Sequence, residues 1–208
     1  MGTTDDSVLN EPFYGSENMV TLDISHSIRR LVMKEIIDVM IPENTIQKRI
    51  EEIAEEISRD YAGLTVTLIC VLKGGVIFFS DLARKLNVDI EMDFIVVSSY
   101  ENAPETSGTV KIVKDIAQPV TGKHVLLVED ILDTGHTLSQ LMRHLSEQQP
   151  ASLKICTLLD KPDRRVVACV IPEYTGFVIP DQFVIGYGLD YKQRYRQLPY
   201  IGLIRFEK

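Results

Sequence analysis

The fold of this chain is decided by residues 125–138, which read VLLVEDILDTGHTL. The first four are an uninterrupted apolar run, as in a central parallel strand covered on both faces. Glu129 and Asp130 follow, where such a strand should emerge from its sheet. The DTGHT segment then opens an apolar-periodic stretch, so its backbone N–H groups and threonine hydroxyls can surround a phosphate at a helix N-terminus. The whole stretch predicts a site for a phosphorylated sugar.

A buried strand that ends in acidic residues has other interpretations. P-loop ATPases hold magnesium at such a position, and many α/β proteins bind nothing there. However, the sequence contains no G-x-x-x-x-G-K-[ST] run and no G-x-G-x-x-G fingerprint after a strand. These absences favour the sugar-phosphate hypothesis.

Composition sets outer limits on function. With 208 residues, 45% of them hydrophobic and 25% charged, one well-filled domain is expected. A net charge of −8 argues against nucleic acid or an anionic membrane as the main partner. Cys70, Cys156 and Cys169 lack metal-ligand spacing and predict reduced thiols in the core of a cytosolic protein. Because the first ten residues are polar and acidic and no run of 18 apolar residues occurs, we expect a cytoplasmic location and no membrane partner.

Strand and helix patterns alternate along most of the chain. Residues 1–20 are polar and predict a mobile arm, and residues 23–40 have the spacing of an amphipathic helix. Pro42 precedes a clearer helix over 43–61, which Gly63 ends. Beyond it we expect strands over 64–72, 90–98, 110–115, 125–128 and 152–159, and helices over 75–86 and 138–148. That order predicts a mostly parallel twisted sheet with helices on both faces and a site at the carboxyl ends of its strands.

Residues 98–109 interrupt the alternation. They lack apolar periodicity and are rich in small polar residues, which fits either a mobile lid or a solvated hairpin.

The 125–138 stretch resembles the signature of type I phosphoribosyltransferases, which use 5-phosphoribosyl 1-pyrophosphate. The resemblance covers about residues 38–206 and implies the fold of that family: a mostly parallel twisted sheet flanked by helices, with a small hood formed by terminal segments. We therefore expect an N-terminal extension over 1–37, partly mobile, and a single domain over 38–208. Its hood would take about 38–45 and 160–208.

The resemblance assigns the opening stretch to the ribose and its 5′-phosphate. Glu129 and Asp130 would address the ribose hydroxyls, partly through metal-bound water. Asp133 would exchange a proton with N7 of a purine, although it could also act as a helix N-cap, and both roles can hold at once. His136 departs from many relatives and either adds charge near the phosphate or points to solvent. The implied site comprises Glu129, Asp130, Asp133, Thr134, Gly135, His136 and Thr137.

A second turn, Leu72-Lys73-Gly74-Gly75, can present backbone amides and an ammonium group to an oxyanion. Glycines after strands also serve turns alone. In the resembling family this loop binds pyrophosphate, and the 72–73 peptide bond is often cis. A Ser-Tyr pair in the lid and an arginine near the C-terminus complete that site. The implied pyrophosphate residues are Lys73, Gly74, Ser99, Tyr100 and Arg196.

Two further segments bear on the base. Lys161 closes a strand in LLDKP; by itself it predicts a solvated surface lysine, but the purine-salvage branch has a lysine here that bonds the purine 6-oxo group. Residues 180–191, PDQFVIGYGLDY, resemble the hypoxanthine-guanine hood, in which Phe183 would stack on the base, unless it is a core residue. The implied purine residues are Lys161, Phe183, Val184 and Asp190, and the implied metal-binding residues are Asp190, Glu129 and Asp130.

Together these matches imply an enzyme that transfers a phosphoribosyl group to N9 of hypoxanthine or guanine, with Mg²⁺ as cofactor. Homodimers or homotetramers are usual in the family. Two alternatives remain: a silent regulatory protein that senses the phosphoribosyl donor, and a xanthine-preferring relative. The acidic charge and the hood disfavour the sensor. Discrimination between hypoxanthine, guanine and xanthine depends on backbone carbonyls at the purine 2-position, so the side chains in the sequence do not predict which base is preferred.

Overall fold

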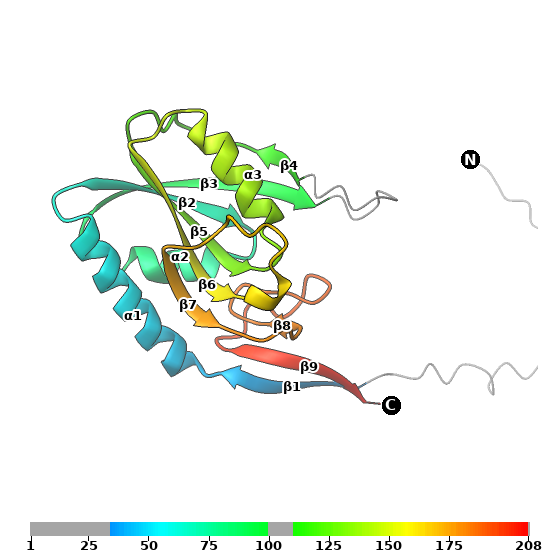
Figure 1. The fold of residues 1–208 in the computed structure, drawn as a ribbon. Helices are drawn as coiled ribbons and strands as arrows, with labels where there is room; N and C mark the ends of the chain where they lie inside the picture. The colour runs from blue at the N-terminus through cyan, green and yellow to red at the C-terminus, as the bar shows by residue number, and fades with distance from the viewer. Residues whose placement is uncertain (1–33, 100–109, 208) are drawn as a thin grey trace, which may run out of the picture. The chain divides into compact units, whose positions relative to one another are not determined.

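The computed structural model describes residues 34–99 and 110–207, and residues 35–207 form one compact unit (Figure 1). Its centre is a six-stranded sheet in the order β4-β3-β2-β5-β6-β7. The strands are β2 (Thr65–Leu72), β3 (Asp89–Ser99), β4 (Val110–Lys114), β5 (His124–Leu132), β6 (Ser152–Asp160) and β7 (Tyr174–Val178). All neighbours are parallel except β4, which pairs antiparallel with β3. The predicted, mostly parallel α/β sheet is confirmed.

The middle strands are covered on both faces, as their apolar runs predicted. Six consecutive residues of β5, from Val125 to Asp130, are buried. Side chains of this strand alternate between two hydrophobic clusters: Leu126 and Val128 belong to one, and Val125 and Leu127 to the other. Because each fully buried Leu or Val contributes about 1.5–3 kcal/mol, the acidic pair follows a strand that is firmly held in the core.

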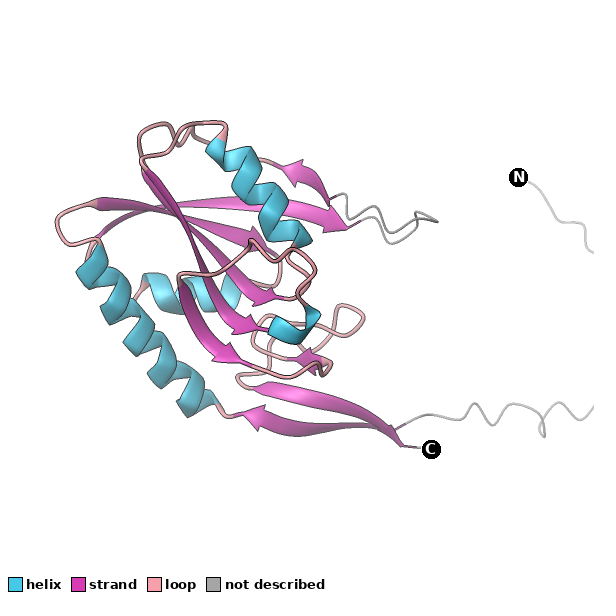
Figure 2. Cartoon of the chain, in the orientation of Figure 1, coloured by secondary structure: helices cyan, strands magenta, loops and turns pink. Residues whose placement is uncertain are grey.

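Helices cover both faces of this sheet (Figure 2). Helix α1 (Glu43–Asp60) and helix α2 (Val76–Ala83) pack in the first cluster, whereas α3 (His136–Ser146) packs in the second. The helix predicted over 43–61 is confirmed, and one of its faces is buried: Ile46, Ile50, Ile53, Ala54 and Ile57. Helix α3 begins two residues earlier than predicted, because Gly135 turns the chain with a φ of 89° and starts the helix at once.

A second, three-stranded sheet joins distant parts of the chain. It consists of β1 (Lys34–Ile41), β9 (Ile201–Glu207) and β8 (Val184–Ile185), in the order β1-β9-β8. Figure 1 shows β1 and β9 side by side. The helix predicted over 23–40 is therefore wrong for residues 34–40, and its earlier part lies outside the described residues. The KEIIDVMI segment is rich in β-branched residues, and pairing with β9 overrides its helical spacing.

Three details differ from expectation or extend it. Strand β7 falls within the range predicted for the hood but pairs with β6 in the central sheet. Cys70 and Cys156 are buried as predicted, whereas Cys169 is exposed, because it lies in an irregular segment after β6 rather than in a strand. Within 34–99 and 110–207, no helix is long and apolar enough to cross a membrane.

Candidate active site

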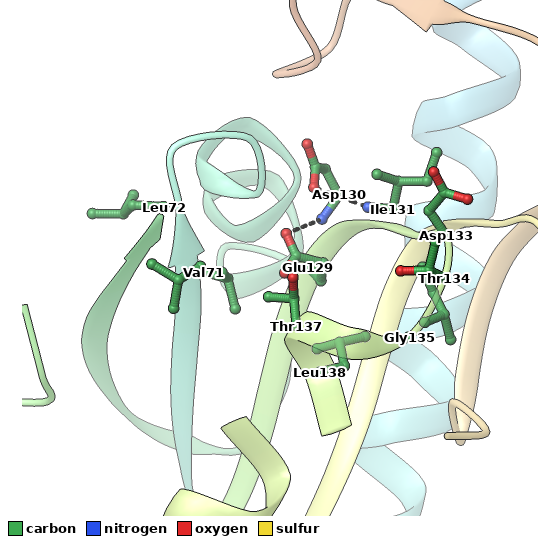
Figure 3. Close-up of a pocket in the computed structure, with 12 residues that line it drawn as sticks. Val71, Leu72, Glu129, Asp130, Ile131, Asp133, Thr134, Gly135, Thr137 and Leu138 are labelled. Atoms are coloured by element: carbon green, nitrogen blue, oxygen red, sulfur yellow. Dashed lines mark hydrogen bonds between the residues drawn. The ribbon is translucent and has the colours of Figure 1, made fainter. Parts of the chain in front are cut away.

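A cavity of about 330 Å³ lies where β2 and β5 end. Val71 and Leu72 line one side, and the turn that follows β5 lines the other (Figure 3). Its remaining lining residues include Glu129, Asp130, Asp133, Thr134, Gly135 and Thr137. The structure therefore brings six of the seven residues predicted for the ribose and 5′-phosphate into one cavity, at the sheet edge that the fold class predicted.

Glu129 and Asp130 are buried, each with only 7% of its surface exposed. Burial raises the pKa of Glu129 well above its usual range, and the neighbouring Asp130 charge adds to the effect. Burial also raises the pKa of Asp130, against hydrogen bonds that favour its charged form. One of these is donated by the Ile131 N–H to Asp130 Oδ1 at 2.9 Å. Such a pair of desolvated acids is suited to a ligand that brings hydroxyl groups or positive charge.

The turn after β2 lies directly against Asp130. A Cβ added to Gly74 would come within 1.8 Å of Asp130 Oδ2, so any larger residue would displace the turn or the carboxylate. The preceding Leu72–Lys73 peptide bond is cis, as the resemblance implied. Lys73 itself is exposed.

The turn from Asp133 to Thr137 is fixed from outside the helix it starts. The N–H groups of Val166 and Val167 both donate to the Thr134 carbonyl, at 2.9 and 3.0 Å. Arg165 Nε donates to the Asp133 carbonyl at 3.2 Å, and its guanidinium also pairs with Asp160. The turn is thus held in place before any ligand binds.

The carboxylate of Asp133 does not cap α3. Gly135, which has no side chain, occupies the N-cap position, and the N–H of His136 donates to Thr134 Oγ1 at 3.5 Å rather than to Asp133. Instead, Arg164 Nε donates to Asp133 Oδ1 at 3.1 Å. The N-cap interpretation is therefore wrong, because the left-handed Gly135 places the N-cap position two residues beyond Asp133.

The residues predicted for the base lie beside this cavity rather than in its lining. Lys161 is 7% exposed, which rules out a solvated surface lysine, and its Nζ donates to the Gln182 carbonyl at 2.6 Å. Phe183 is not a core residue, since 58% of its surface is exposed and its ring meets Tyr191 edge-to-face at 5.9 Å. Val184 is buried in β8.

Asp190 and Arg196 are joined in the segment after β8. Their side chains form an ion pair at 2.5 Å, and the Gln193 N–H donates to Asp190 Oδ2 at 2.8 Å. Arg196 also donates to the Gly188 carbonyl at 2.6 Å. Gly188 in turn lies on the turn after β2, because an added Cβ would be 2.0 Å from the Gly74 carbonyl oxygen. Backbone contact therefore places this segment against the turn that touches Asp130.

Some predicted residues stand apart. His136 begins α3 but does not line the cavity. Tyr100 lies outside the described residues, as does most of the predicted lid, and only the backbone of Ser99 is described.

Three contacts of the site were not predicted from the sequence. They are the contact of Gly188 with Gly74, the ion pair of Arg164 with Asp133, and the hydrogen bond from the Arg165 side chain to the Asp133 carbonyl. The pair of arginines shortly after β6 was the available signal for the last two.

Comparison with known proteins agrees with this arrangement. A family model described as phosphoribosyl transferase domain matches residues 42–192. The hypoxanthine phosphoribosyltransferase of Escherichia coli K12 is 49% identical over 174 residues, which covers 83% of this chain and 97% of that protein. The hypoxanthine-guanine phosphoribosyltransferase of Streptococcus pneumoniae R6 is 44% identical over 177 residues, or 85% of this chain and 98% of that one. A crystal structure of a hypoxanthine-guanine phosphoribosyltransferase from Bacillus anthracis superimposes with a TM-score of 0.78 at 47% identity, and covers 81% of this chain and 98% of its own.

Proposed function

Because this chain belongs to the phosphoribosyltransferase family, we propose a role for each part of its site in the reaction of that family. The chain is an enzyme of the transferase class that carries a phosphoribosyl group from 5-phosphoribosyl 1-pyrophosphate to N9 of hypoxanthine or guanine. The products are a nucleoside 5′-monophosphate and pyrophosphate. The observation that carries the assignment of roles is the cavity that joins Glu129 and Asp130 to the turn of Asp133.

The donor binds along the edge of the central sheet. The N–H groups and hydroxyls of the turn from Thr134 to Thr137 bind the 5′-phosphate at the N-terminus of α3. Glu129 and Asp130 accept hydrogen bonds from the ribose hydroxyls. Lys73, Arg196 and the amides of the Gly74 turn, together with Ser99 and Tyr100, surround the pyrophosphate, where negative charge develops as the C1′–O bond breaks.

Asp133 acts on the purine. Its side chain is 39% exposed and lies on the cavity wall, so an incoming base can reach it. As N9 attacks C1′, Asp133 accepts the proton from N7, which keeps positive charge from accumulating on the base.

Lys161, Phe183 and Val184 hold the base. The buried ammonium of Lys161 donates to the 6-oxo group, which adenine lacks, and the exposed ring of Phe183 is free to stack on the purine. The Val184 backbone meets the purine 2-position. A nearby Gln182 carbonyl orients the lysine, since it already accepts from Nζ at 2.6 Å.

The carboxylates of this site suit Mg²⁺. Asp190 offers a single carboxylate next to an arginine, which fits an ion that keeps several of its waters, while Glu129 and Asp130 are buried acids whose raised pKa values mark the cost of their uncompensated charge. Asp190 would hold the ion, with Glu129 and Asp130 contributing through water, and the bound Mg²⁺ would supply positive charge to offset the negative charge that develops on the leaving pyrophosphate.

We further propose that the enzyme works in the cytoplasm as a homodimer or homotetramer and binds no nucleic acid, consistent with its net charge of −8.

The test is steady-state formation of nucleotide from the donor, Mg²⁺ and each of hypoxanthine, guanine and xanthine. We expect product with hypoxanthine, guanine or both, and no turnover after the metal is removed by a chelator. A chain that binds the donor but forms no nucleotide would support the sensor, and a preference for xanthine would reassign the base.

A further inference from the structure

Arg164 connects the two halves of the site. Its Nε lies 3.1 Å from Asp133 Oδ1 in the ribose-phosphate turn and 3.7 Å from Asp181 Oδ1 in the segment that leads to Phe183. Both carboxylates raise the pKa of this guanidinium, so it stays charged. One cation therefore stands between the carboxylate that handles the proton and the segment that carries the stacking ring.

The position of Arg164 follows from the local backbone. Residues 162–164 form a short 3₁₀ turn directly after Lys161, and the Arg164 N–H donates to the Lys161 carbonyl at 3.1 Å. Lys161 binds the same segment, through the Gln182 carbonyl at 2.6 Å and Asp181 at 4.0 Å. Lys161 and Arg164 thus both contact the segment that leads to Phe183, residues 181–183, which we call the purine segment, and Arg164 also contacts Asp133.

From this geometry we propose that Arg164 is a positioning residue for phosphoribosyl transfer. It holds the Asp133 carboxylate in the orientation that receives the N7 proton, and through Asp181 it keeps the purine segment in register with that carboxylate. The inference rests on the proposed role of Asp133. Arg164 acts through Asp133 and is assigned no contact with substrate.

A purely structural role does not explain the contact. The Arg164 side chain is 47% exposed and the two carboxylates are 39% and 53% exposed, and ion pairs this open to water contribute little to folding. The neighbouring Arg165 has the structural task, since its side chain is 12% exposed and bonds the backbone of the turn and the buried Asp160. The two adjacent arginines divide the work: one fixes the backbone of Asp133 and the other its carboxylate.

The test measures kcat, KM and thermal unfolding for Arg164→Gln, with hypoxanthine and the phosphoribosyl donor as substrates. We expect kcat to fall about tenfold, because a misplaced catalytic group is costly, while KM for the donor and the melting temperature change little. Lys123→Gln is the matched control. It removes a cation from another exposed ion pair, with Glu91 at 2.6 Å, at the opposite end of β5, and should leave kcat unchanged.

A double-mutant cycle with Asp133→Asn separates positioning from a general charge effect. If Arg164 acts through the carboxylate, Arg164→Gln should lower kcat by less than twofold once Asp133 is an asparagine. Arg164→Lys, which keeps the charge, should recover part of the kcat that Arg164→Gln loses.

The possible outcomes distinguish the positioning role of Arg164 from the phosphoribosyl transfer on which that role rests. A wild-type chain that makes no nucleotide refutes the proposed function. An active wild type with unchanged kcat in Arg164→Gln, or a full additional tenfold loss in the Asp133→Asn background, refutes only the role of Arg164. A kcat that Asp133→Asn leaves intact removes Asp133 from the mechanism and the positioning role with it, while phosphoribosyl transfer stands.

Discussion

The two halves of the site are built in opposite ways. Around Glu129 and Asp130, the edge of the central sheet is buried, and its shape is set by backbone: a glycine against a carboxylate and a turn held by N–H groups. On the purine side the Phe183 ring is exposed, and the segment that carries it is held by side-chain pairs such as Asp190 with Arg196. The difference teaches that the ribose-phosphate half is preorganised by folding, whereas the purine half can be altered residue by residue.

The largest effect should come from the glycine that joins the two halves. Gly74→Ala adds a Cβ 1.8 Å from Asp130 Oδ2, so the turn or the carboxylate must move. We expect a loss of about 1–3 kcal/mol in the free energy of unfolding from overpacking, and a fall of roughly 100-fold or more in kcat/KM from the displaced site. Chemical denaturation and steady-state kinetics measure the two losses.

Gly63→Ala separates stability from activity in that experiment. Gly63 has a φ of 78°, and nothing lies within 4 Å of the added Cβ, so the variant is strained but leaves the site untouched. If Gly63→Ala loses as much kcat/KM as Gly74→Ala for the same loss in the free energy of unfolding, the contact of Gly74 with Asp130 is not specifically required for activity.

Asp133→Asn tests the chemistry of the preorganised half. The amide keeps the shape of the side chain but cannot accept a proton, so kcat should fall roughly 100-fold while donor affinity stays close to wild type. Turnover and a donor titration by calorimetry give the two quantities. Equal losses in kcat and donor binding would mean that the residue shapes the pocket rather than moves a proton.

The site shows which features could be predicted from the sequence and which could not. The strand, the acidic pair and the phosphate turn were predictable from a short local stretch, because a continuous apolar run and the placement of a glycine are local properties. The pairing of β1 with β9 and the contact of Gly188 with Gly74 were not, because they join segments more than 100 residues apart and depend on tertiary packing. Arg164 was overlooked for the same reason: its partner Asp133 lies 31 positions away.

Lys161→Ala addresses the purine half. Removing a buried ammonium should raise KM for hypoxanthine about tenfold or more, since a hydrogen bond to a charged group contributes about 1.5–3 kcal/mol. The KM for the donor should stay near wild type. A larger change for the donor than for the purine would place Lys161 in the ribose-phosphate half instead.

Phe183→Ala should have the smallest effect of the series. The ring is 58% exposed, so its loss should leave the melting temperature nearly unchanged, whereas lost stacking should raise KM for hypoxanthine roughly fivefold. Thermal unfolding and steady-state kinetics of Phe183→Ala measure the melting temperature and the KM. A marked drop in melting temperature would show that this side of the site is as firmly packed as the sheet edge.

The most direct test of the division between the halves is the wild-type ratio of kcat/KM for hypoxanthine to that for adenine, measured with the same donor and Mg²⁺. The preorganised half treats both bases alike, so the buried Lys161 and the segment around Phe183 must discriminate. A site built to bond the 6-oxo group should favour hypoxanthine by roughly 1,000-fold or more. Equal use of the two bases, or a preference for adenine, would contradict the account.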